Sequence, residues 1–202
     1  MIIKSITVSM FATNCYLVAC PTTKDAVIID PGAEGKSIIA RVRALDLNVK
    51  MIVNTHGHID HIGANHYVKE QTGAPVLLHR QDLALYHNPG FGLNLVTKKQ
   101  PEPDRFIADG DLLHFGDFRL QALETPGHSA GSISLLGEGV VFCGDTLFAG
   151  SIGRTDLAGG SYSQIISSIK ERLLNLPGNT IVYPGHGPQT TIGDEKMHNP
   201  YL

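Results

Sequence analysis

The chain has 202 residues, of which 42% are hydrophobic and 17% are charged, a balance typical of a compact folded protein rather than a disordered one. The net charge of −3 argues against a surface dedicated to nucleic acid or to anionic lipid, so we expect neither as a partner. The sequence also lacks a run of about eighteen consecutive apolar residues, the length that a helix needs to cross a bilayer.

The three cysteines, Cys15, Cys20 and Cys143, cannot all pair with one another. The first residues, MIIKSITVSMF, alternate in polarity like a strand and are too polar for an export signal. Unpaired thiols are typical of a reducing compartment. We therefore expect a cytoplasmic protein.

The first half of the chain predicts alternating short strands and helices. Strands are expected where apolar, β-branched runs end at Gly, Pro or polar residues, at 14–20, 26–30, 49–54 and 76–78. Apolar residues between 38 and 45 recur at a spacing of about 3.6 residues and predict a helix. Further helices are expected at 62–72 and 81–86.

The segment 87–105 is rich in Pro and Gly and divides the two halves of the chain. Loops this long in compact proteins often act as lids or binding loops, and others are excursions without structure. The sequence leaves both interpretations open, and it leaves open whether Lys98 and Lys99 in this loop meet an anionic substrate or are only solvated.

The second half predicts strands again, at 118–123, 132–136, 140–142 and 180–183. A helix is expected over 162–176, with Ser161 and Gln164 as a capping box and Pro177-Gly178 as its end. Two sheets packed face to face, with helices outside, would bury both faces of such strands. We expect an α/β fold in one domain over residues 1–202.

A cluster of potential metal ligands follows the strand expected at 49–54. The segment NTHGHIDHIGAN places His56, His58, Asp60 and His61 within six positions. Imidazole nitrogen and carboxylate oxygen are common ligands of zinc and neighbouring transition metals. Such a density of ligands directly after an apolar strand predicts a metal site rather than a solvated turn.

Three more potential ligands lie beyond expected strands of the second half, in TPGHSAGS, FCGDTLF and YPGHGP. They are His128, Asp145 and His186. Each follows a glycine, which permits backbone turns that are closed to other residues. One such residue alone would be more typical of a structural turn. Together with the first cluster, they indicate that several strand ends deliver ligands to one place.

These motifs resemble the metallo-β-lactamase superfamily, and within it the glyoxalase II-like thioester hydrolases. The resemblance runs from Asn14 to the C-terminus and includes NCYLV, DPG, TPGHSAGS, GDTLFAGSIGRTD and TTIGDEKMHNPYL. It implies a four-layered αβ/βα sandwich with the site at one edge between the sheets. Sixteen residues follow His186, so the C-terminal helical domain of two-domain glyoxalase II enzymes is not expected, and the tyrosine that follows their last ligand is missing.

The resemblance also implies which residues hold which ion. His56, His58 and His128 would bind one metal, Asp60, His61 and His186 the other, and Asp145 would bridge the two. Two zinc ions are the expected cofactors, with iron or manganese as possible substitutes. A structural zinc would instead be closed by four ligands, often cysteines, and no cysteine belongs to this set.

A site of this kind predicts a metal-dependent hydrolase. Zinc lowers the pKa of bound water from about 15.7 to about 7, so a metal-bridging hydroxide would be available to attack a carbonyl. Asp60 is suited to orient it and to pass a proton. Because zinc binds sulfur well, a thioester such as S-D-lactoylglutathione, or a thioester of a similar thiol, is the expected small-molecule substrate.

Other reactions remain open at this point. A persulfide dioxygenase of the same fold would bind one iron, which the resemblance assigns to His56, His128 and Asp145. Other ester or lactone hydrolases and a non-catalytic member are further alternatives. Activity of β-lactamase classes B1 and B2 is not expected, because the resemblance places a cysteine at position 145 in those enzymes. The sequence does not fix the oligomeric state.

Several residues near the motifs carry smaller expectations. Thr55 and Ser129 could form hydrogen bonds to the neighbouring ligands or belong only to turns. Arg154 and Asp156 are expected to form an ion pair that fixes the loop after Asp145. The remaining histidines are expected to lie on the surface or around the site: His66, His79, His87, His114 and His198.

Overall fold

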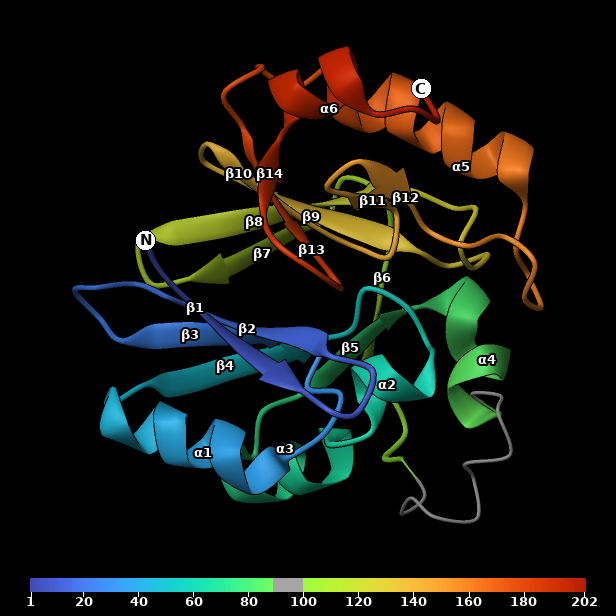
Figure 1. Cartoon of the computed structure of the whole chain (residues 1–202). Coiled ribbons are helices and arrows are strands. Elements are labelled where there is room, and N and C mark those ends of the chain that lie inside the picture. Colours follow the sequence, from blue (N-terminus) through green and yellow to red (C-terminus); the bar gives the residue numbers. More distant parts are fainter. Residues whose placement is uncertain (89–99) are drawn as a thin grey trace.

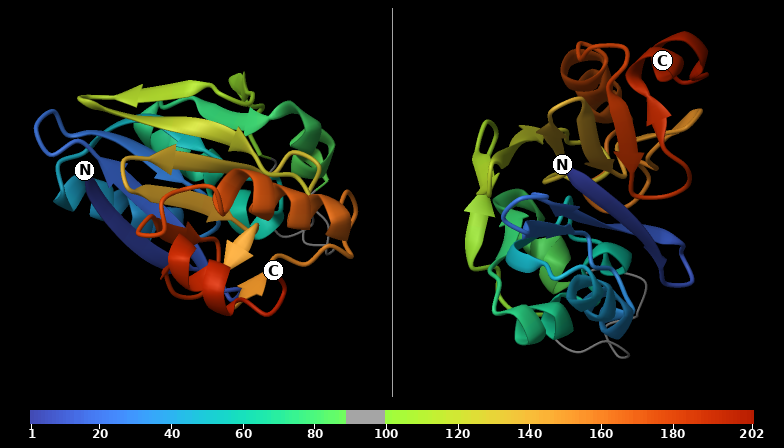
Figure 2. Two further views of the ribbon diagram at one scale, coloured as in Figure 1. Left: turned by 90° about the horizontal axis from the view of Figure 1, so that it is seen from above. Right: turned by 90° about the vertical axis from the view of Figure 1, so that its left-hand side faces the viewer.

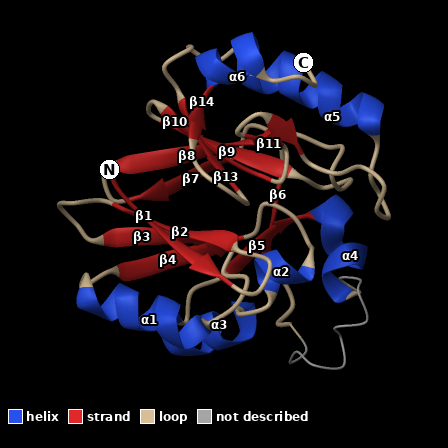
Figure 3. Cartoon of the chain, in the orientation of Figure 1, coloured by secondary structure: helices blue, strands red, loops and turns tan. Residues whose placement is uncertain are grey.

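The computed structural model describes residues 1–88 and 100–202, which form two β-sheets packed face to face between outer helices (Figure 1). The expected loop 87–105 lies largely outside the described residues, including Lys98 and Lys99. Helices cover only the outer faces of the two sheets, and the colouring by secondary structure makes the four layers visible (Figure 3). This arrangement confirms the α/β sandwich predicted from the sequence.

The first sheet contains six strands in chain order, β1 (Ile2–Val8), β2 (Thr13–Ala19), β3 (Asp25–Ile29), β4 (Asn48–Val53), β5 (Val76–His79) and β6 (Arg105–Ile107). The second sheet has the order β14-β13-β10-β9-β8-β7. Its strands are β7 (Leu112–Phe115), β8 (Phe118–Glu124), β9 (Ile133–Gly137), β10 (Val140–Gly144), β13 (Ile181–Pro184) and β14 (Thr190–Thr191). A small ribbon pairs β11 (Leu147–Phe148) with β12 (Ser151–Ile152).

Helices from each half of the chain cover the sheet of that half (Figure 2). On the first sheet these are α1 (Gly35–Ala44), α2 (Ile59–Ile62), α3 (Asn65–Thr72) and α4 (Leu83–His87), the last preceded by a 3₁₀ turn (Arg80–Asp82). On the second sheet they are α5 (Tyr162–Ser168), which continues as a π-helical turn (Ile169–Leu173), and α6 (Ile192–His198). In the described part of the chain, no helix combines the length and hydropathy needed to cross a membrane.

Alternate residues of the central strands belong to different cores, because successive side chains of a strand point to opposite faces. In β10, Phe142 packs between the sheets, whereas Val141 and Cys143 pack under the outer helices. In β2, Tyr16 faces the other sheet and Leu17 faces the helices α1 and α3. This double burial explains why the strands read as continuous apolar runs rather than alternating ones.

Strand direction brings the ends of several strands to one edge of the sandwich. β3, β4 and β5 are parallel, so their carboxyl ends lie together, and β10 is parallel to β13. At this edge the two sheets are joined by backbone hydrogen bonds from Asn14 N to Gly185 O, at 2.7 Å, and from Ile133 N to Thr55 O, at 2.9 Å. The residues that follow these strands therefore face a common space.

Some expected elements differ in the structure. The helix predicted over 62–72 begins only at Asn65, and Ile62 ends the separate helix α2, which was not predicted. Between the two helices, Gly63 packs against the backbone of Gly32 and Ala64 N donates to Pro31 O at 2.9 Å. The Ser161 hydroxyl does accept from Gln164 N, so the predicted N-cap of α5 is confirmed. The strands β6, β7, β11, β12 and β14 and the helix α6 were not predicted from the sequence.

Candidate metal centre

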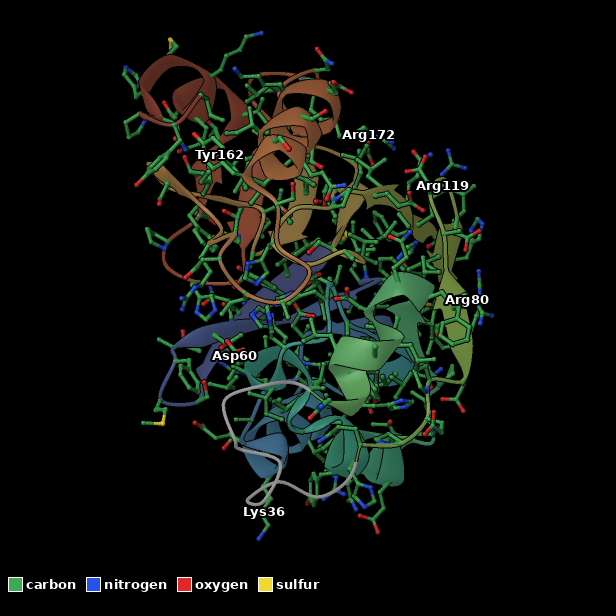
Figure 4. The ribbon with its side chains drawn as sticks, turned by 90° about the vertical axis from the view of Figure 1, so that its right-hand side faces the viewer. Lys36, Asp60, Arg80, Arg119, Tyr162 and Arg172 are labelled. Atoms are coloured by element: carbon green, nitrogen blue, oxygen red, sulfur yellow. The ribbon has the colours of Figure 1, made fainter. Side chains whose placement is uncertain are left out.

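The fold brings together the potential ligands that the sequence scatters from residue 56 to residue 186. Their ligand atoms form three groups, within each of which all atoms lie within 4.8 Å of one another. The groups are His56, His58 and His128; Asp60, His61 and His186; and His56, His61 and Asp145. Figure 4 shows Asp60 near the junction of the two halves of the molecule. The first two groups have the same members as the two ligand sets that the resemblance implies, and the third places Asp145 beside one member of each.

In three of the histidines, one ring nitrogen is engaged by an acceptor outside the cluster. The Nδ1 atoms of His61, His128 and His186 lie 3.0 Å from Asp30 Oδ2, 2.8 Å from Arg154 O and 3.0 Å from Phe11 O, respectively. Because a carboxylate and a carbonyl can only accept, each Nδ1 is the donor. The lone pair of each neutral ring is therefore on Nε2, which faces the cluster and can bind a metal.

His56 is oriented in the same way through Thr55. The Thr55 hydroxyl donates to Asp30 Oδ2 at 2.6 Å, so it accepts from His56 Nδ1 at 3.1 Å. The Nε2 atom of His56 is buried and has no hydrogen-bond partner among the described residues. A buried polar atom without a partner is costly, and a metal ion at this point would remove the cost. The donor set thus fits a metal ion.

The two ligand groups meet at the Asp145 carboxylate. Oδ1 lies 3.3 Å from His61 Nε2, and Oδ2 lies 3.5 Å from both His128 Nε2 and His186 Nε2. Within the first group, His58 differs from the other rings, because its Nδ1 faces His128 Nε2 at 2.9 Å. Within the second group, Asp60 Oδ2 lies 3.2 Å from His186 Nε2. The Asp145 carboxylate therefore contacts histidines of both groups.

The two groups differ in their electrostatics. Burial, reinforced by neighbouring imidazoles, lowers the pKa of His56 well below its usual value and that of His58 to about 4. Burial also acts to lower the pKa of His186, but its hydrogen bonds to Asp145 and Asp60 outweigh this effect and raise the pKa to about 10. The carboxylates likewise raise the pKa of His61 against the effect of burial. Without metal, the second group therefore holds protons where a cation would bind.

Two glycines allow the ligand loops to approach one another closely. Gly144, directly before Asp145, has a φ of +49°, and a Cβ there would collide with Thr55 Oγ1. A Cβ at Gly185, directly before His186, would collide with Asp145 Oδ1. The glycines that precede two of the ligands in the sequence are thus required by the packing of the site itself.

Two buried aspartates outside the predicted set hold the ligand loops. Asp30 follows β3 and accepts from Thr55 N at 2.7 Å, in addition to its contacts with Thr55 Oγ1 and His61. Asp82 accepts from Gly57 N at 2.8 Å, Ser129 Oγ at 2.7 Å and Gly131 N at 2.6 Å. Asp82 therefore joins the loop of His56 and His58 to the loop of His128.

The sequence contains a recognisable motif for Asp30 but not for Asp82. The DPG motif placed Asp30 at the end of a predicted strand, beside the end of the next one, which could have identified it. Nothing in the segment HRQDL separates Asp82 from an ordinary acidic residue at the start of a short helix.

The smaller expectations have mixed outcomes. Of the two alternatives left open, Thr55 forms a hydrogen bond to its neighbour His56, whereas the Ser129 hydroxyl bonds to Asp82 and Ser132. The predicted pair of Arg154 and Asp156 is confirmed, with two contacts of 2.8 and 2.7 Å. Among the other histidines, His79 and His87 pair with Glu124 and Glu102, respectively.

A cavity of about 410 Å³, here called the cluster cavity, opens over the ligands. His58, Asp60, His128, Asp145 and His186 form its floor, and its walls include Phe11, Phe148, Ile152, Arg154 and Leu157. Its volume falls in the range of small-molecule sites, about 300–1,000 Å³.

The raised pKa of His186 predicts that metal binding releases protons. The ring is protonated below a pH of about 10, and only the neutral ring can bind a metal through Nε2, so an ion must displace that proton at neutral pH. Zinc affinity is expected to fall as the pH falls. Calorimetric titrations of metal-free protein, in buffers of different ionisation enthalpy, measure the proton release. Identical heats in all buffers would contradict it.

The position of Asp82 predicts an effect on metal affinity. Asp82→Ala leaves two buried backbone N–H groups without their acceptor, at a cost of about 1–3 kcal/mol each, and frees the loops that carry His56, His58 and His128. We expect zinc to dissociate about 10–100-fold more readily, with a lower free energy of unfolding in urea. Glu138→Ala, at an exposed carboxylate, is the control. A destabilised Asp82→Ala protein with unchanged zinc affinity would restrict Asp82 to a role in stability.

Comparisons with known proteins agree with this geometry. The family model of the Metallo-beta-lactamase superfamily matches residues 9–186. The hydroxyacylglutathione hydrolase GloC of Haemophilus influenzae is 40% identical over 99% of this chain and 97% of its own length.

Two solved structures are also similar over nearly the whole chain. The BLEG-1 B3 metallo-beta-lactamase has a TM-score of 0.91 and 38% identity, covering 100% of this chain and 99% of that chain. TTHA1623 in a di-iron-bound form has a TM-score of 0.90 and 38% identity, covering 98% of this chain and 100% of that chain. With its ligand-rich edge between two sheets, the chain belongs to the metallo-beta-lactamase superfamily.

Proposed function

We propose that the protein is a metal-dependent thioester hydrolase similar to hydroxyacylglutathione hydrolases, with S-D-lactoylglutathione or a related acyl thioester as its substrate. The observation that carries the proposal is the placement of Asp145 between two ligand groups on the floor of the cluster cavity. A single structural ion would need neither a shared carboxylate nor an open cavity.

The proposed ligand sets follow the geometry. His56, His58 and His128 would hold one ion, and Asp60, His61 and His186 the other, with Asp145 shared. We favour zinc, which accepts imidazole and carboxylate ligands and binds the sulfur of a leaving thiolate. When bound, two such ions would supply the Lewis acidity that polarises a carbonyl and makes water a nucleophile at neutral pH.

Asp60 is the residue that we propose as catalytic. Its Oδ2 atom accepts from the Thr13 hydroxyl at 3.1 Å, which fixes the carboxylate at the edge of the cluster cavity. From there Asp60 can orient the attacking water and accept its proton. The water oxygen bonds to the acyl carbon, the carbon–sulfur bond breaks, and the thiolate takes up the proton, so that a carboxylic acid and a thiol leave.

The choice of a thioester is supported by the similarity to the hydroxyacylglutathione hydrolase GloC over nearly the whole length of both chains. The cavity wall adds Arg154, the one cation among its lining residues other than the histidines. Two N–H groups of Arg154 pair with Asp156, and the remaining ones could donate hydrogen bonds to a polar thiol arm on that side of the site. The known relatives differ in the reactions and metals that their names state, so the substrate is tested directly.

The test combines metal content with turnover. Elemental analysis of purified protein is expected to give two metal ions per chain, and S-D-lactoylglutathione is expected to release thiol that a chromogenic disulfide detects. One iron per chain with oxygen uptake on a glutathione persulfide, and no thiol release, would replace the proposal by a dioxygenase. Hydrolysis of a β-lactam without thioester turnover would replace it by a lactamase.

Asp145→Ala tests the shared carboxylate. Because the side chain contacts ligands of both groups, we expect the variant to lose most of its metal and to lower kcat/KM by about 1,000-fold or more, on the order of 4 kcal/mol. His114→Ala changes an exposed residue of β7 and is expected to leave turnover within a few-fold. A fully active Asp145→Ala protein with two bound metals would contradict the shared role.

A further inference from the structure

A second cavity, which Arg154 does not line, adjoins the site. This cavity, here called the hairpin cavity, measures about 550 Å³ and lies between the tip of the β1–β2 hairpin and the residues around α1 and α2. Its walls are largely apolar and include Met10, Phe11, Ala33, Ile59, Ala64 and Tyr67. Phe11 and Asp60 line both cavities, so the two meet at the proposed catalytic carboxylate.

The hairpin tip is held over the cavity by specific contacts. Ser9 N donates to Glu34 Oε1 at 3.2 Å, and the Ser9 hydroxyl accepts from Phe11 N at 3.1 Å. The Phe11 carbonyl in turn accepts from His186. Ser9 and Ala12 both have positive φ, at 65° and 55°, a conformation that costs free energy outside glycine. The tip is thus fixed to the cluster on one side and to Glu34 on the other.

The tip nevertheless presents apolar side chains to solvent. Met10 is 91% exposed and Phe11 is 44% exposed, although both border the hairpin cavity. Covering such surface with an apolar group is favourable by about 25 cal/mol per Å². Because the tip is already anchored, a bound group would gain this contact without first ordering the loop.

The acyl carbon of a thioester carries two arms, and the two cavities share Phe11 and Asp60 but are otherwise lined by different residues. The cluster cavity has the cation Arg154 in its wall and suits the polar thiol arm. The hairpin cavity offers apolar contacts and, near α1, the carboxylate of Glu34. A neutral apolar acyl chain fits these walls, whereas an acyl chain that ends in a carboxylate would approach Glu34 and be repelled.

We propose that the hairpin cavity binds the acyl arm of the substrate and selects neutral, apolar acyl chains longer than the lactoyl group. This inference rests on the proposed thioester hydrolysis and adds the substrate class that the site prefers. In this proposal a lactoyl or acetyl group is expected to stay near the border at Asp60 and Phe11, and a hexanoyl group is expected to extend towards Met10, Ala33 and Tyr67.

The first experiment compares glutathione thioesters that differ only in the acyl chain: acetyl, hexanoyl and adipoyl. We expect kcat/KM for the hexanoyl thioester to exceed that for the acetyl thioester by about tenfold or more, since each buried methylene adds to binding. The adipoyl thioester has the same number of acyl carbons but ends in a carboxylate, and its kcat/KM is expected to be close to that of the acetyl thioester. Equal rates for all three would overturn the inference and leave the proposed function standing.

Ala33→Phe fills the hairpin cavity from a residue that is neither a ligand nor next to one. The ratio of kcat/KM for hexanoyl over acetyl thioester is expected to fall by about tenfold. Ala44→Phe makes the same change at an exposed residue of α1 and should leave this ratio unchanged. If Ala33→Phe instead alters the response to different thiols at a constant acyl group, the cavity holds the thiol arm and the inference is wrong.

A binding measurement separates this inference from the proposed reaction. In the zinc-loaded protein labelled with ¹³C-methyl methionine, a hexanoyl ketone in which methylene replaces the thioester sulfur should shift the Met10 methyl resonance. The acetyl ketone should not, and Ala33→Phe should abolish the shift. A Met10 shift without thioester turnover would support the apolar cavity and contradict the proposed function. If neither the Met10 shift nor thioester turnover is observed, the inference and the proposed function are both wrong.

Discussion

The hydrogen bonds that leave the histidine cluster are the constraint on which the site depends. His56, His61, His128 and His186 each direct Nδ1 to an acceptor outside the cluster, and this fixes the free lone pair on Nε2. An imidazole whose ring could flip or change tautomer would have no fixed lone pair directed at the ion. The acceptors are therefore as necessary to a metal centre as the ligands themselves.

Some of these acceptors are side chains, and others are backbone carbonyls. Asp30 supplies a side chain from the end of β3, and it serves His61 directly and His56 through Thr55. His128 and His186 instead use backbone carbonyls, from Arg154 and from Phe11. The loop that follows β12 and the β1–β2 hairpin thus orient two of the histidines through their backbone conformation. The ion pair of Arg154 and Asp156 holds the same loop whose Arg154 carbonyl accepts the hydrogen bond from His128.

The sequence predicted the elements whose signal is local and strong. The apolar strands 14–20, 26–30 and 49–54 and the helix around Ile38 stand close to their predicted positions, because each buries residues at the spacing of its own structure. The short strands β6, β11, β12 and β14 are defined by their pairing, β6 with β5, β11 with β12 and β14 with β13. Two or three residues carry too little pattern to predict such pairing.

In the site, too, features with a local sequence signal were predicted and features that depend on long-range packing were not. The potential ligands were predicted because histidine and aspartate are chemically distinctive and follow strands at glycine-marked turns. The role of Asp82 was not, because it depends on the approach of two loops separated by more than seventy positions in the chain, Gly57 and Gly131. The hairpin cavity is likewise a property of packing. No pattern in the sequence around Met10 and Phe11 predicts that a cavity separates them from Tyr67.

The placement of the ligands on both sheets has a consequence for the unfolded chain. His58 and His128 are 70 positions apart, and His61 and His186 are 125 positions apart, yet each pair faces one binding point. An ion held by such a pair closes a loop of that length, as a disulfide does, and removes conformational entropy from any unfolded state that keeps it. A centre assembled for chemistry would then also act as a reversible cross-link between the two halves of the polypeptide.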